Sequence, residues 1–253
     1  MSFKRVVMNE NFLLAFENFN SEFNNNDYSN VITNKKFTIR DTDFTYRIIN
    51  HWANHGLFEE VRSEENKGWR KFSLVDVTWL KILTELRRFG LSLEKIRVGH
   101  NAFRAHGMPL EFGIFMCILK KAINLIIFSD GHIEMADKNA IIKRESIGHF
   151  DEQSYLVVSL NSCLARIFPK KDFKPKLNTF ELSEKEILIL NVIRSGNFQE
   201  ICIHFKNGET DRFDNKTKHF NEIGKLSDIL HQVSHEEFSM EKIDNKIIFI
   251  ENI

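Results

Sequence analysis

The chain has few of the residues that interrupt or covalently brace a fold. Of its 253 residues only 3 are proline and 3 are cysteine. Cys117, Cys163 and Cys202 lie far apart within apolar stretches, and no Cys-x-x-Cys pair occurs. This spacing argues against a zinc ribbon or a dithiol redox motif. It predicts buried free thiols in a reducing compartment.

Long apolar runs are missing as well. No window of about 18 apolar residues occurs, so the sequence predicts no membrane-spanning helix. The N-terminal stretch MSFKRVVMNENF lacks the apolar centre of a secretory signal. We therefore expect a cytoplasmic protein, and the abundance of Asn, Lys, Ile and Phe suggests an AT-rich genome.

The common catalytic fingerprints are also absent. The sequence contains no P-loop, no Gly-x-Gly-x-x-Gly and no Gly-x-Ser-x-Gly. We therefore expect no enzyme activity and no cofactor. The formal net charge of the chain is zero.

The charge is nevertheless unevenly distributed. Residues 35–104 contain 14 Lys/Arg against 9 Asp/Glu, a balance of +5, and the two flanking segments are weakly acidic. A locally basic segment within a neutral chain is typical of a DNA-binding module joined to other domains.

Hydrophobic periodicity and turn residues predict an α+β chain with four parts. Residues 1–34 form an N-terminal helix or flexible arm, and residues 35–104 form a helix-rich domain. Residues 105–180 form a small α+β unit whose Asp130-Gly131 pair predicts a hairpin. Residues 181–253 form a ββαββ unit whose Asn207-Gly208 pair is the strongest hairpin signal in the chain.

The basic segment contains clear helix boundaries. Thr45 is placed to cap a helix that ends at Gly56, and Ile48, Ile49 and Trp52 are expected to face inward. Residues 59–72, EEVRSEENKGWRKF, follow as a short hairpin, which we call the wing. Ser73 and Asp76 form a capping-box pattern for the next helix, which closes at Gly90, and Ser92 begins another.

This succession resembles the DNA-binding domain of the MerR-type regulators over about residues 44–98. The resemblance rests on motifs that follow one another in the family's order and spacing: His51-Trp52 with Gly56-Leu57, Gly68-Trp69-Arg70-Lys71-Phe72, Asp76 with Leu80, and Leu86-Arg87 with Gly90, Ser92-Leu93 and Ile96. It implies a winged helix-turn-helix fold that binds double-stranded DNA.

The resemblance also implies which side chains meet DNA. The recognition helix would enter the major groove and the wing would lie on phosphates. On the recognition helix the candidates are Tyr46, Arg47, Asn50, His51 and Asn54. On the wing they are Arg62, Arg70 and Lys71.

The chain departs from the family pattern at several points. Asn50, His51 and Ala53 stand where the family usually has Arg, Tyr and Glu, and the first helix of the motif is truncated. No heptad pattern follows residue 98, and Gly99, Gly107 and Pro109 are expected to interrupt the helix there. Dimerisation through the family's long helix is therefore not expected.

The sequence contains two candidate metal sites. His51 and His55 have the spacing of metalloprotease ligands, but Trp52 occupies the place of the required glutamate. His55, in the last turn, is better explained by the helix dipole. A second cluster, Asp130, His132, Glu134 and Asp137, fits a hairpin with polar residues on a solvated face better than a metal loop. We expect no metal site.

The function predicted from the sequence is sequence-specific DNA binding, with transcription regulation as the favoured role. Residues 105–253 would mediate self-association or contact with a protein partner. The alternative is a non-enzymatic protein–protein adaptor, or a DNA-architectural accessory factor of a phage or mobile element, built on the same fold.

Overall fold

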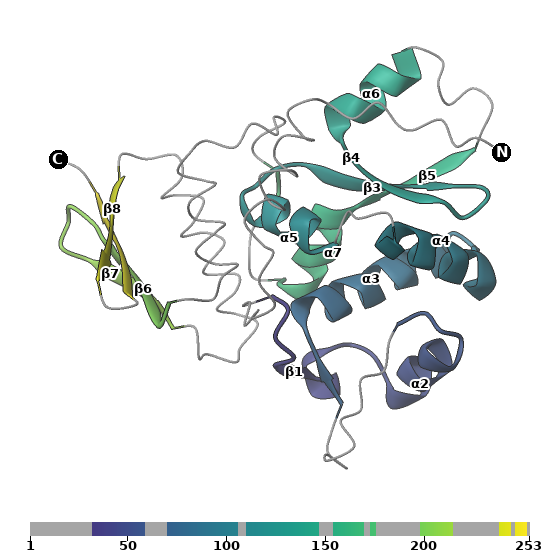
Figure 1. Cartoon of the computed structure of the whole chain (residues 1–253), viewed down its shortest axis with the longest axis horizontal. Helices are drawn as coiled ribbons and strands as arrows, with labels where there is room; N and C mark the ends of the chain where they lie inside the picture. The colour runs from purple at the N-terminus through teal and green to yellow at the C-terminus, as the bar shows by residue number, and fades with distance from the viewer. Residues whose placement is uncertain are drawn as a thin grey trace.

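The computed structural model describes residues 32–58, 70–105, 110–146, 154–169, 173–175, 198–214, 238–243 and 246–251. They form a mixed α+β structure (Figure 1). The predicted N-terminal helix or arm and the helix of the predicted ββαββ unit lie outside the described residues. Within the described residues, no helix has the length and apolar character needed to cross a membrane.

The N-terminal part begins with short elements. Strand β1 (Phe37–Thr38) leads into the 3-10 helix η1 (Ile39–Asp41) and then into helix α2 (Tyr46–Asn54). Strand β2 (Lys71–Phe72) precedes helices α3 (Leu74–Arg88) and α4 (Leu93–Ala105). The end of the wing pairs with the start of this region, because β2 lies antiparallel to β1 with Phe72 opposite Phe37. Residues 59–69 lie outside the described part.

The predicted helix boundaries are confirmed. The Thr45 hydroxyl accepts a hydrogen bond from the Ile48 amide, and Gly56 follows α2 with a φ of +66°. Ser73 and Asp76 form a complete capping box at the start of α3. Gly90 follows α3 with a φ of +84°, a conformation that residues with a Cβ rarely adopt.

The central part consists of a three-stranded antiparallel sheet and three helices. Its elements are α5 (Leu110–Ile118), β3 (Ile123–Phe128), β4 (Ile133–Asp137), α6 (Lys138–Ser146), β5 (Tyr155–Ser159) and α7 (Leu160–Ile167). The strand order is β4-β3-β5, and the β3–β4 turn at Asp130-Gly131 is the predicted hairpin. Helix α6 packs beside β4, and α5 and α7 pack on β3.

The expectation that Gly99 interrupts the helix after residue 98 is wrong. Gly99 does not interrupt α4, which continues to Ala105. The glycine is there because α4 crosses the β3–β4 turn at very short range. A Cβ on Gly99 would lie 1.8 Å from the carbonyl oxygen of Gly131, and a Cβ on Gly131 would lie 2.8 Å from the carbonyl oxygen of Lys95. The two glycines therefore allow two backbones to touch.

The C-terminal strands form a separate sheet. They are β6 (Glu200–His204), β7 (Thr210–Asp214), β8 (Phe238–Ile243) and β9 (Lys246–Glu251), in the order β7-β6-β9-β8. The two predicted hairpins are confirmed, with Gly208 at a φ of +83° in the first. The inner strands β6 and β9 are parallel, which the sequence did not predict.

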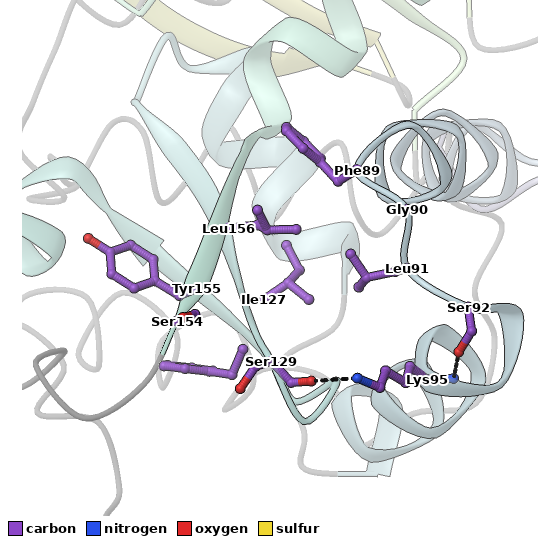
Figure 2. Close-up of a pocket in the computed structure, with 11 residues that line it drawn as sticks. Phe89, Gly90, Leu91, Ser92, Lys95, Ile127, Ser129, Ser154, Tyr155 and Leu156 are labelled. Atoms are coloured by element: carbon purple, nitrogen blue, oxygen red, sulfur yellow. Dashed lines mark hydrogen bonds between the residues drawn. The ribbon is translucent and has the colours of Figure 1, made fainter.

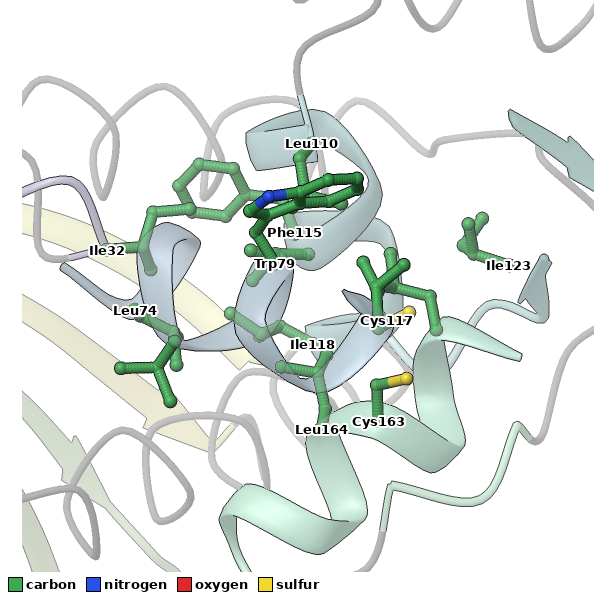
Figure 3. Packing of buried hydrophobic residues seen from close by; sticks show 14 of the residues in the cluster. Ile32, Leu74, Trp79, Leu110, Phe115, Cys117, Ile118, Ile123, Cys163 and Leu164 are labelled. Atoms are coloured by element: carbon green, nitrogen blue, oxygen red, sulfur yellow. The ribbon is translucent and has the colours of Figure 1, made fainter. Parts of the chain in front are cut away.

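The helices α3, α5 and α7 share one apolar core (Figure 3). Trp79 of α3, Phe115 of α5 and Leu164 of α7 contribute to it. Cys117 and Cys163 lie in the same core, and all three cysteines are free and buried, as predicted. Burial raises the pKa of Cys117 and of Cys163, which disfavours their reactive thiolate forms.

Candidate nucleic-acid interface

Helix α2 is held on α3 by a small set of buried side chains. Ile49 is fully buried and Trp52 is nearly so, and Phe44 meets the Trp52 ring edge-on with 5.6 Å between centroids. Past the helix, the indole Nε1 of Trp79 donates a hydrogen bond of 2.6 Å to the carbonyl oxygen of Leu57. These contacts fix the orientation of α2, which a recognition helix requires.

An ion pair at the other end of α2 adds to this anchoring. The ammonium of Lys81 on α3 lies 2.5 Å from a carboxylate oxygen of Asp43, just before the helix. The same ammonium lies 5.2 Å from the centre of the Phe44 ring. Both ends of α2 are thus tied to α3, by apolar burial and by charge.

The face of α2 opposite the core carries all of the predicted helix contacts. These residues are exposed, and they are Tyr46, Arg47, Asn50, His51 and Asn54. Within the described residues, the side chains of Arg47, Asn50 and Asn54 form no hydrogen bond or ion pair. Their donors and acceptors are available to an external ligand.

The predicted inward orientation of Ile48 is wrong, since this side chain is 39% exposed. Ile48 lies next to the buried Ile49 in sequence, but about 100° around the helix from it. The element before α2 is the three-residue helix η1.

The candidate wing residues differ in exposure. Lys71 is exposed at the start of β2, whereas Arg70 just before it is half-buried. Arg62 lies outside the described residues. The structure therefore places one freely accessible wing cation close to β1 and leaves the tip of the wing undescribed.

The two histidines of α2 interact with each other and with the helix end. Their ring centres are 4.4 Å apart, and the Nδ1–H of His55 donates a hydrogen bond of 2.7 Å to the carbonyl oxygen of His51. The His51 carbonyl also accepts the backbone amide of His55, so the His55 side chain adds a second hydrogen bond at the end of the helix. Over the described part of the chain, no group of three or more potential metal-ligating side chains occurs.

The polar residues of the β3–β4 hairpin, Asp130, His132, Glu134 and Asp137, form hydrogen bonds within the protein. The Asp130 carboxylate accepts a hydrogen bond from the His132 amide, and the His132 ring lies 3.1 Å from the Glu134 carboxylate. Asp137 was expected on a solvated face, but it is buried, because its carboxylate accepts a hydrogen bond from the Ala140 amide at the start of α6.

Sequence reasoning missed one basic residue near α2. Arg97 of α4 is exposed, and its aliphatic chain lies against the end of α2, where a Cβ on Gly56 would be 3.4 Å from the Arg97 Cδ. Its only described acidic neighbour, Glu94, is 4.0 Å away and exposed. The residue is 41 positions beyond Gly56, so only the packing of α4 brings it beside α2.

Comparison with known proteins agrees with this geometry. Residues 38–98 match the family model described as MerR HTH family regulatory protein, and this segment is a MerR-type helix-turn-helix DNA-binding segment. The matched range contains α2, β2, α3 and the first half of α4. No curated protein and no solved structure matches the chain. The family consists of DNA-binding transcription regulators and is generally non-enzymatic.

Proposed function

We propose that the chain is a sequence-specific, double-stranded DNA-binding transcription regulator of the bacterial cytoplasm. Its N-terminal part would act as a winged helix, with α2 in the major groove and residues 59–72 as the wing on phosphates. A central α+β unit and a C-terminal ββαββ unit would follow and mediate self-association or contact with a protein partner. The observation that carries this proposal is the exposed polar face of α2 over the buried Ile49 and Trp52.

The chemistry of that face suits base recognition. An α-helix fits the major groove of B-DNA, where guanine presents two acceptors and adenine presents an acceptor and a donor. Arginine pairs bidentately with guanine and asparagine with adenine. Arg47 and Asn50 are one turn apart and have no partner within the described residues, so they are proposed as the principal base contacts. Tyr46, His51 and Asn54 would complete the surface.

Basic residues around α2 would supply phosphate contacts. Lys71 and Arg70 stand at the end of the wing, and Arg62 belongs to its undescribed part. Arg97, beside the end of α2, would add a contact from α4. Such contacts position a protein on DNA without reading its sequence.

The direct test is a binding titration with labelled genomic fragments at increasing salt. Phosphate contacts release condensed counterions, so log K should fall linearly with log[salt]. A slope of roughly −3 to −4 is expected if about four cations meet phosphates, since the slope is about −0.9 per contact. The Arg97→Ala and Lys71→Ala variants should each flatten the slope by about one unit.

The alternative function is a protein–protein adaptor that retains the fold without affinity for DNA, and the neutral net charge is compatible with it. An architectural accessory factor would bind DNA with the same salt dependence but little sequence preference. If no salt-dependent binding to any fragment is detected, the DNA-binding proposal fails and the adaptor is favoured. Sequencing of DNA recovered with the protein from cells would separate regulator from architectural factor.

A further inference from the structure

A groove of about 390 Å³ lies where the α3–α4 connection meets the central sheet (Figure 2). One wall is formed by residues 89–92 and Lys95, and the other by parts of β3 and β5. Its volume falls within the range of about 300–1,000 Å³ typical of small-molecule sites. The proposed DNA contacts lie on α2, on the wing and at Arg97 of α4, and none of these residues lines the groove.

The floor of the groove is apolar. Ile127 and Leu156 are paired across β3 and β5 and therefore project to the same face of the sheet. Figure 2 shows their side chains and that of Leu91 directed toward one another. Leu91 and Leu156 are only partly buried, and Phe89, at one end of the groove, is 53% exposed. A bound hydrocarbon would cover these surfaces.

The opposite end of the groove carries a positive charge. The Lys95 ammonium donates a hydrogen bond of 3.1 Å to the carbonyl oxygen of Ser129, and this bond holds it at the groove (Figure 2). An ammonium has three donors, so others are available. Lys95 forms no ion pair with any carboxylate in the part of the chain described. The hydroxyls of Ser92, Ser129 and Ser154 also line the groove.

We infer that this groove is a binding site for a small organic acid with an apolar body. The carboxylate would lie at Lys95, and the aliphatic or aromatic part would cover Leu91 and Leu156, over the buried Ile127, and reach Phe89. The distribution of charge selects this chemistry, because Lys95, the one cation among the described residues that line the groove, stands at one end of an apolar floor. A neutral apolar molecule would leave Lys95 without a counter-charge, and a small polar anion would leave the floor exposed.

The inference is tested on the full chain with two probes, 4-phenylbutyrate and octanoate, by ligand-observed NMR titration. Both should bind with a dissociation constant on the order of 0.1–1 mM, as ligands of this size do. Their neutral amides, 4-phenylbutyramide and octanamide, should bind roughly three- to fivefold more weakly, the effect of one exposed ion pair. No detectable binding of either acid at millimolar concentration would overturn the site.

Two variants test whether the acid binds in this groove, and they separate the contribution of the charge at Lys95 from that of the apolar surface at Phe89. Lys95→Gln should abolish the preference for acid over amide, and Phe89→Ser should weaken acid and amide alike. Phe89 is exposed, so the second variant is expected to fold normally. Matched controls are Lys138→Gln and Ile250→Ser, which remove an exposed cation and an exposed apolar side chain elsewhere. Acid binding that neither Lys95→Gln nor Phe89→Ser changes, or equal affinity for acids and amides, contradicts the inference.

Discussion

Arg47 and Asn50 stand one turn apart on α2, exposed, on either side of the buried Ile49 in sequence. Their roles are separable by substitution, because a base contact carries sequence information and a phosphate contact does not. We predict that Arg47→Ala reduces the difference in affinity between a selected site and a scrambled one by roughly 1–3 kcal/mol. Competition titrations with both DNAs measure it. Arg88→Ala, an exposed arginine on α3, serves as the control and should leave the difference unchanged.

Arg70 belongs to a different class of contact. It directly precedes β2 and is half-buried, so it is held close to the fold. Arg70→Ala should weaken binding to all DNA sequences equally, by roughly 1–2 kcal/mol. Affinity for selected and scrambled DNA at low salt is the measurement. Unchanged affinity at low salt would mean that the wing is assigned wrongly.

His132 makes the stability of the hairpin depend on pH. Its hydrogen bond with Glu134 raises the pKa of His132, so the folded state favours the protonated ring. The stabilisation is therefore complete below the ordinary histidine pKa of about 6.5 and is lost as the pH rises through the raised value. Urea unfolding from pH 5.5 to 8.5 should show this loss. In the Glu134→Gln variant the loss of stability between these pH values should be smaller. If the variant and the unaltered protein lose the same stability over this range, the His132–Glu134 interaction is not its cause.

At the scale of elements, the crossing of α4 over the β3–β4 turn is the most sterically demanding contact described. Gly99→Ala would place a Cβ 1.8 Å from the Gly131 carbonyl oxygen, so the helix or the turn must move. We predict a loss of about 2 kcal/mol or more in the free energy of unfolding. Gly90→Ala is the matched control: it has open space but a φ of +84°, and it should lose only about 1 kcal/mol. Equal losses would show that the crossing relaxes easily.

Local sequence signals predicted most of the described elements. A capping box, a positive-φ glycine and an Asn-Gly turn act through neighbouring residues, so Ser73, Gly56 and Gly208 could be placed without tertiary information. The predictions that Ile48 is buried and that Asp137 is exposed were both wrong, because they depend on tertiary contacts and not on neighbouring residues. Their exposure depends on contacts between elements: Asp137 is buried where its carboxylate accepts a hydrogen bond from the start of α6, whereas Ile48 stays 39% exposed.

At the scale of the molecule, the N-terminal and central parts form layers in Figure 1: α2, then α3 and α4, then the sheet of β3, β4 and β5, then α6. Helix α3 packs on α7 and α5, and α4 packs on β4. We predict that a fragment of residues 35–104 unfolds without the cooperative transition of the full chain, because it loses these partners. The fragment also lacks Ile32, whose carbonyl oxygen accepts a hydrogen bond from the Leu74 amide. Thermal melts followed by near-UV circular dichroism compare the two, and a sharp transition in the fragment would contradict the prediction.

The sequence alone was sufficient for the features that depend on short-range order. It identified the MerR-type segment, the exposed face of α2 and the free buried cysteines, because helical periodicity and local motifs set which residues lie on one side of an element. Only the tertiary structure decided which segments far apart in the sequence come into contact. Arg97 beside Gly56, Gly99 against Gly131 and the groove between Leu91 and Leu156 arise from contacts between elements, and no local pattern encodes the distance between two backbones.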